Sequence, residues 1–126
     1  MIDTDLMLRD GTVEMNSSEA TPTAIDFGGE DLVPMTYFVD VLESSDGGSE
    51  TLDVVIEGSN TSASAGFETI CTFPQITAVT GKAQFIKEAI CNYRWRRAKI
   101  TLGGDTSPSF HGVKVYACPA GRYDQK

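Results

Sequence analysis

The sequence predicts an all-β fold, and three observations support this prediction. About seven to nine short segments alternate apolar and polar residues with a period of two, the pattern of half-buried strands. Turn residues such as Gly, Asn, Asp, Ser and Pro separate these segments about every 8–12 residues, and no long segment has convincing helical periodicity. This spacing favours an antiparallel β-sandwich or jelly roll over a βαβ fold, although it does not separate a sandwich from a barrel.

The totals indicate one domain that remains where it is made. With 126 residues, of which 40% are hydrophobic and 22% charged, the chain can bury a sizeable core without metals or disulfides. No run approaches the roughly 18 apolar residues of a membrane helix. The start, MIDTDLMLRDG, is acidic where a signal peptide is basic and lacks its apolar region. We therefore expect neither secretion nor contact with a membrane.

Residues of the types used in catalysis and metal binding are sparse and scattered. The three cysteines, Cys71, Cys91 and Cys118, are too widely spaced for a zinc site and odd in number, which favours buried reduced thiols. A disulfide between two of them stays open. The single histidine, His111, has no nucleophile or orienting group near it in the sequence. We expect a protein that is not an enzyme and that uses no cofactor or metal.

The charge is divided unevenly along the chain. Residues 1–60 carry a balance of −13 with Arg9 as their only base, and residues 61–126 carry +5, which gives the net charge of −8. An acidic solvated surface that maintains solubility is the first interpretation. The alternative is that opposite ends of the fold contact differently charged surfaces, such as neighbouring subunits.

The clearest stretch is 92–119, which we expect to form a hairpin at the centre of an antiparallel sheet. YRWRRAKITL places Tyr93 and Trp95 on one face and Arg94 and Arg96 on the other, and FHGVKVYAC alternates again after the turn GGDTSPS. The apolar face after residue 97 is one position out of step with Trp95. A β-bulge at Arg96 and Arg97 would explain this slip.

The preceding segments predict further strands. MTYFVDVLESS (35–45) and TLDVVIEGS (51–59) form a predicted second hairpin, with alternate residues from Tyr37 and from Leu52 buried. FETICTF (67–73) is a strand that Pro74 ends. AQFIKEAIC (83–91) has apolar residues that also fit helical spacing, and we favour a strand only slightly over a helix.

The N-terminal residues allow two interpretations. In LMLRDGTVEM (6–15), an Asp-Gly pair lies between strand-like residues, which is a good hairpin signal. The arms are short, so an arm that orders only against another surface is about equally well supported. We therefore divide the chain into an N-terminal arm or hairpin over 1–24 and a jelly-roll domain over 25–126.

A basic cluster with one aromatic residue, Arg94-Trp95-Arg96-Arg97, is the most distinctive local feature. The first interpretation is structural, with Trp95 in the core and Arg94 and Arg96 in salt bridges outside. A protein interface comes second, because Trp and Arg are enriched there. Nucleic-acid binding is disfavoured, because a net charge of −8 repels a polyanion.

The order of several segments resembles a known family over nearly the whole chain. The segments are MIDTDLMLRDGT, LDVVIEGSNTS, GFETICTFPQIT and YRWRRAKITLGGDTSPSFHGVKVYA, and they resemble the Bbp16-like capsid cement (decoration) proteins of tailed bacteriophages. The resemblance implies a jelly roll that binds the outer surface of an HK97-like shell and bridges neighbouring major capsid protein subunits. It further implies a homo-oligomer, a dimer first and a trimer second, made in the host cytoplasm and carried on the virion. It supplies no catalytic residues.

Two sets of residues are candidates for the interface under this resemblance. Arg94, Arg96 and Arg97 would make charged contacts, and the N-terminal arm with Leu6 and Leu8 would add a strand to a neighbour. The alternative function is that of a carbohydrate-binding, galactose-binding-like sandwich whose end loops hold a sugar. The aromatic residues here lie within a predicted strand rather than in the loops, which places this alternative second.

Overall fold

The computed structural model describes residues 7–9, 11, 18–19, 22–27, 33–44, 49–77, 82–104 and 108–119. Within these ranges every regular element is a strand, so the described residues contain no helix that could cross a membrane. The strands are β1 (Met7–Arg9), β2 (Ile25–Asp26), β3 (Val33–Val41), β4 (Glu43–Ser44), β5 (Thr51–Ser59), β6 (Glu68–Thr72), β7 (Ala83–Cys91), β8 (Trp95–Gly103), β9 (Phe110–His111) and β10 (Lys114–Pro119).

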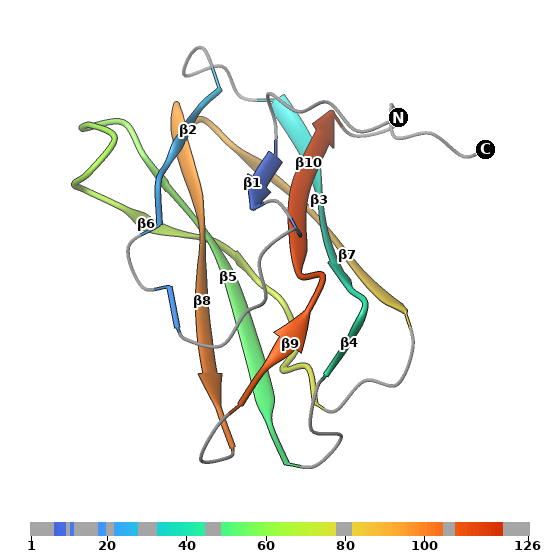
Figure 1. The fold of residues 1–126 in the computed structure, drawn as a ribbon. Coiled ribbons are helices and arrows are strands. Elements are labelled where there is room, and N and C mark those ends of the chain that lie inside the picture. Colours follow the sequence, from blue (N-terminus) through green and yellow to red (C-terminus); the bar gives the residue numbers. More distant parts are fainter. Residues whose placement is uncertain are drawn as a thin grey trace.

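The strands form two four-stranded antiparallel sheets, which Figure 1 shows with β8 and β5 in one and β10, β3 and β7 in the other. The first sheet has the order β1-β10-β3-β7, and the second has the order β2-β8-β5-β6. When the short pair β4-β9 is set aside and the remaining strands are renumbered in sequence, these orders read 1-8-3-6 and 2-7-4-5. Apart from β5 and β6, which pair with each other in the second sheet, successive strands thus alternate between sheets, as in a jelly roll. The predicted all-β, antiparallel jelly-roll sandwich is confirmed.

The hairpins predicted over 35–59 and 92–119 do not form, because the two strands of each pair with other strands. β8 and β10 lie in different sheets, and so do β3 and β5. Instead β10 pairs with β3, and β8 pairs with β5 over nine residue pairs. Periodicity identifies a strand and its buried face, but two strands close in sequence can pack across a sandwich as well as pair edge to edge. The turn composition between them therefore did not reveal that the chain crosses between sheets.

The buried faces predicted for β3 and β5 are confirmed. Alternate residues of β3 and β5 point into the space between the sheets, and their side chains are almost completely inaccessible to water. β8, β9, β10 and the residue before β10 contribute further central residues. The core formed in this way contains Tyr37, Val39, Val41, Leu52, Val54, Ile56, Ala98, Ile100, Phe110, Val113, Val115 and Ala117, among others.

The structure resolves the choice between strand and helix for 83–91 and contradicts the bulge predicted in β8. Residues 83–91 are a strand, paired with β3 along their whole length. The bulge predicted at Arg96 and Arg97 is absent, because β8 pairs with β5 in unbroken register from Trp95 to Gly103. An irregularity occurs instead in β6, where Ile56 faces Cys71 and the next residue of β5 faces Thr69.

The N-terminal segment that is described belongs to the first sheet. Met7 pairs with Tyr116 of β10, and Leu8 is buried in the core cluster. Leu6 and the residues that would complete a hairpin beyond Gly11 lie outside the described ranges. The division between 1–24 and 25–126 stays a prediction.

The alternation in β5 can be tested by truncating adjacent side chains. Ile56 is fully buried, whereas Val55 on the opposite face is only half-buried. We expect Ile56→Ala to lower the free energy of unfolding by about 2–5 kcal/mol, because it removes buried methyl groups and leaves a cavity. Val55→Ala is the matched control, with a much smaller loss in urea denaturation. Equal losses would contradict the assigned faces.

Candidate functional site

Arg96 lies inside the sandwich, with only 3% of its surface exposed. Its Nε donates a hydrogen bond to the Tyr93 carbonyl at 2.8 Å, and its Nη1 donates to the Tyr37 hydroxyl at 2.6 Å. The guanidinium carbon is 4.5 Å from the centre of the Phe27 ring. The expectation that Arg96 lies outside in a salt bridge is therefore wrong. Unbroken alternation along β8 places it on the same inner face as Ala98 and Ile100.

Trp95 has the opposite placement from the one expected. It points to the outer side of the second sheet, where it is half-buried beside Arg94. The Arg94 guanidinium lies 4.8 Å from the Trp95 ring centre and forms two hydrogen bonds, of 2.9 and 2.8 Å, with the Asp26 carboxylate. The Arg94 side chain remains 45% exposed. The predicted salt bridge of Arg94 is confirmed, and its charge remains accessible.

Arg97, two residues after Trp95 in β8, is also held by a carboxylate and an aromatic ring. Its Nε donates to the Glu57 carboxylate at 2.8 Å, and its guanidinium carbon lies 3.8 Å from the Phe67 ring centre. Arg97 and Glu57 face each other across the pairing of β8 with β5. We call this part of the outer surface the arginine face, and it comprises Asp26, Glu57, Phe67, Arg94, Trp95 and Arg97.

The arginine face is a preorganised surface. Each arginine is held by a carboxylate and by an aromatic ring, so little side-chain entropy remains to be lost when a partner binds. The Arg94–Asp26 pair is exposed, and such pairs contribute little to folding stability, so recognition is the better use of Arg94. The Arg97 and Glu57 side chains are each only 12% exposed, so this pair holds the surface in place more than it offers charge to a partner. Trp and Arg are the residues most often found at the energetic centres of protein interfaces.

The structure thus separates the predicted interface residues. Arg94 and Arg97 lie together on the arginine face, whereas Arg96 and Leu8 are buried and offer no surface to a partner. Leu6 lies outside the described residues. Whether Arg94 and Arg97 contact another protein stays a prediction.

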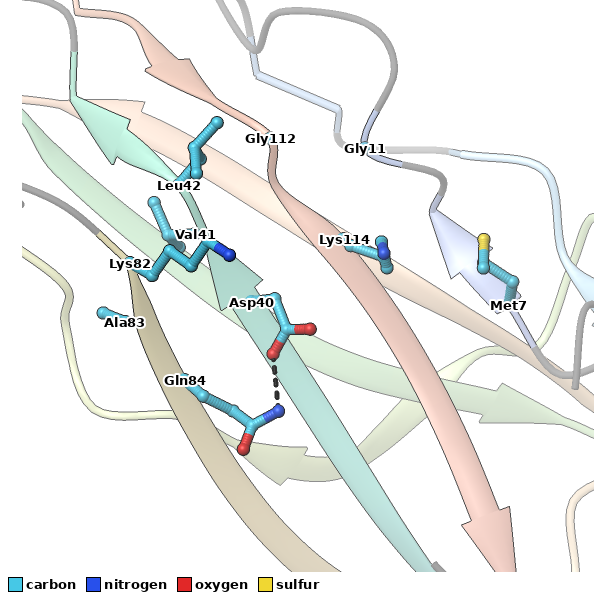
Figure 2. A pocket seen from close by; sticks show the side chains of 10 residues that line it. All are labelled: Met7, Gly11, Asp40, Val41, Leu42, Lys82, Ala83, Gln84, Gly112 and Lys114. Carbon is cyan, nitrogen blue, oxygen red and sulfur yellow. Dashed lines mark hydrogen bonds between the residues drawn. The ribbon is translucent and has the colours of Figure 1, made fainter. Parts of the chain in front are cut away.

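A second candidate site is an open groove of about 860 Å³ over one end of the first sheet. Figure 2 shows its lining, which comes from β1, the end of β3, the beginnings of β7 and β10, and residues beside these strands. The lining residues are Met7, Gly11, Asp40, Val41, Leu42, Lys82, Ala83, Gln84, Gly112 and Lys114. No local sequence motif marks this groove, because its residues come from four separate parts of the chain.

A hydrogen-bonded cluster borders the groove. Gln84 Nε2 donates to Asp40 Oδ1 at 2.8 Å and to the Tyr116 hydroxyl at 3.0 Å, and that hydroxyl donates to Asp40 Oδ2 at 3.0 Å. The Tyr116 ring stacks on Phe38 with 4.8 Å between the ring centres. Burial, followed by the hydrogen bond to Asp40, raises the pKa of Tyr116 to about 12. Tyr116 is therefore a neutral donor at neutral pH.

The described residues offer little reactive chemistry. None of the three cysteines forms a disulfide. Burial raises the pKa of Cys71 to about 11, so this thiol stays protonated and weakly nucleophilic at neutral pH. Within the described ranges, no three or more His, Cys, Asp or Glu side chains are grouped as a metal site would require. The absence of enzymatic activity stays a prediction.

Comparison with known proteins adds a likeness in fold. No family model and no curated protein matches the chain. A solved structure of the N-terminal CBM22-1 and GH10 modules of Clostridium thermocellum endo-1,4-β-D-xylanase 10B, in complex with xylohexaose, has a TM-score of 0.44 and 18% identity, covering 88% of this chain. The chain spans only 22% of that xylanase chain.

The C-terminal family 22 carbohydrate-binding module of the same xylanase is also similar. It has a TM-score of 0.49 and 10% identity, and the likeness covers 96% of this chain and 98% of the module. At such low identity the likeness concerns the β-sandwich fold alone, and no binding residue is transferred from either structure.

The contact between Arg96 and Tyr37 predicts a coupled effect on stability. We expect Tyr37→Phe to lower the free energy of unfolding by about 1–3 kcal/mol, because a buried guanidinium loses an acceptor. In an Arg96→Met background no donor remains to be satisfied, so the same substitution has a smaller effect. A double-mutant cycle in urea measures this difference. Equal costs in both backgrounds would show that the hydrogen bond does not matter.

Proposed function

We propose that the chain is a structural capsid cement protein of a tailed bacteriophage. It binds the outer surface of an HK97-like shell and bridges neighbouring major capsid protein subunits. The resemblance of four segments to the Bbp16-like family supports this proposal, and so does the jelly-roll topology. The structural feature that best supports this proposal is the arginine face.

The arginine face suits a protein surface better than a small ligand. Its charged and aromatic side chains come from β2, β8, β5 and the segment before β6, so they spread across the width of the second sheet. The exposed guanidinium of Arg94 can reach carboxylates of a partner while Asp26 and Trp95 hold its position. A shell repeats each contact many times, so a modest interface at each site is sufficient.

The second candidate function is carbohydrate binding in the groove. Asp40 and Gln84 offer hydrogen-bonding groups of the kind that recognise sugar hydroxyls, and Lys82 and Lys114 stand beside them. Among the described residues, the groove lining contains no aromatic side chain, and Tyr116 at its border is buried against Phe38. Without an exposed ring on which a sugar could stack, this function ranks second.

Co-sedimentation with phage shells that lack the protein tests the proposal. We expect the full chain to pellet with the shells and to saturate at a fixed ratio to the major capsid protein. Arg94→Glu reverses an exposed charge on the arginine face, and we expect it to weaken binding at least tenfold. Lys114→Glu is the matched control, since it makes the same charge change on the first sheet and should bind normally.

The outcomes separate the two functions. If the unmodified protein stays in the supernatant at every concentration, the cement function is wrong. If Arg94→Glu binds like the unmodified protein, the contact lies elsewhere than the arginine face. Titration with a panel of soluble oligosaccharides tests the second candidate, which requires binding that Gln84→Ala removes and Arg94→Glu preserves.

A further inference from the structure

The outer edge of β7 differs from the other sheet edges of the described sandwich. The first sheet ends at β1 and β7, and the second ends at β2 and β6. β1 has three residues, β2 has two, and β6 has five with an irregular register before Pro74. Short length, bulges and nearby proline are the usual means by which proteins protect sheet edges from pairing. Three of the four edges carry such protection.

β7 lacks these three protections, although it carries the exposed charged residues Lys87 and Glu88. It has nine residues, it contains no proline, and its register with β3 runs without a break from Ala83 to Cys91. Among the described residues, only β3 pairs with it. Ile86 and Ile90 on its outer side are 52% and 61% exposed, which makes them the two most exposed large apolar side chains of the described chain. A long, regular edge with exposed isoleucines is a site for strand pairing.

We infer that a second copy of the chain pairs with this edge through its own β7, in antiparallel orientation about a two-fold axis. The two first sheets then join into one sheet of twice the width. The backbone groups along the outer edge of β7 gain partners, and Ile86 becomes covered. Self-pairing of one surface patch is the geometry of a two-fold dimer.

The side chains of β7 select the register. With the axis at Ile86, each Ile86 side chain lies opposite the Ile86 side chain of the second chain. Gln84 then lies opposite Glu88 of the second chain, so that the amide of one can donate to the carboxylate of the other. An axis at Lys87 or at Glu88 would place like charges directly opposite each other, which destabilises a sheet. Among registers that pair at least seven residues of the strand, the axis at Ile86 avoids this conflict.

The same geometry links the dimer to shell binding, a step that rests on the proposed function. A two-fold axis normal to the joined sheet leaves both second sheets on one side of it. The arginine faces, which lie on the outer sides of the second sheets, then point in the same direction. A dimer would therefore present two arginine faces to a shell at once, and binding at one would raise the effective concentration of the other.

The mass of the free protein in solution, without shells, tests the dimer separately from the proposed function. We expect light scattering to give twice the chain mass, and Ile86→Lys to raise the dimer dissociation constant at least tenfold by opposing two lysines at the axis. Leu42→Lys is the matched control, because Leu42 is similarly exposed at 46% and lies outside β7. A monomeric unmodified protein, or a dimer that Ile86→Lys leaves intact, would overturn the inference.

Cross-linking tests the register. Ile86→Cys places a thiol directly opposite its own copy, at a separation that a disulfide can span, and we expect rapid covalent dimer formation under mild oxidation. Ile90→Cys, on the same side of the strand, lies opposite Lys82 of the second chain and should cross-link far more slowly. Equal rates, or faster cross-linking through residue 90, would refute the axis at Ile86.

Discussion

The hydrogen bond between Arg96 and Tyr37 joins the two sheets, and the rest of the arrangement depends on it. Arg96 belongs to β8 of the second sheet, and Tyr37 belongs to β3 of the first. No carboxylate pairs with Arg96 among its described contacts, so its charge is stabilised by neutral groups, namely the Tyr37 hydroxyl, the Tyr93 carbonyl and the Phe27 ring. A buried charge without such partners would be very costly. The register of β8 is therefore held in place by polar contacts as well as by packing.

That register determines the outer surface of the second sheet. Because Arg96 points inward, its neighbours Trp95 and Arg97 must point outward, and Arg97 meets Glu57 across the strand pair. Trp95 and Arg97 of the arginine face therefore lie on the outer side because Arg96 between them is buried. In the first sheet, β3 is the only strand that pairs with the long edge strand β7 among the described residues, and the centre is closed by the pairing of β10 with β3. The proposed recognition surface and the proposed self-association edge would then use different sheets of one sandwich.

The sequence was sufficient for the fold class and for most of the buried faces. Alternation along β3 and β5 identified Tyr37, Leu52 and their neighbours correctly, because these strands follow the simple rule of apolar residues inside. The same rule failed at β8, where it placed Trp95 inside and Arg96 outside. A bulge was then needed to reconcile the pattern, whereas the structure keeps regular pairing and buries the arginine.

Other features depend on contacts that periodicity does not encode. Segment 83–91 fits helical spacing because it is an edge strand whose outer isoleucines are exposed, so its apolar residues are not confined to one face. Strand partners were wrong because successive strands cross between sheets. The groove went unnoticed because Asp40, Gln84 and Tyr116 meet only when three strands pair side by side.

A reconstruction of the phage head by electron cryomicroscopy would test the central claim most directly. We expect density for this sandwich on the outer surface of the shell, with the arginine face against the major capsid protein and two copies joined along β7 across a two-fold axis. Heads that carry the chain but show no such density on the shell, or show the arginine face turned to solvent, would contradict it.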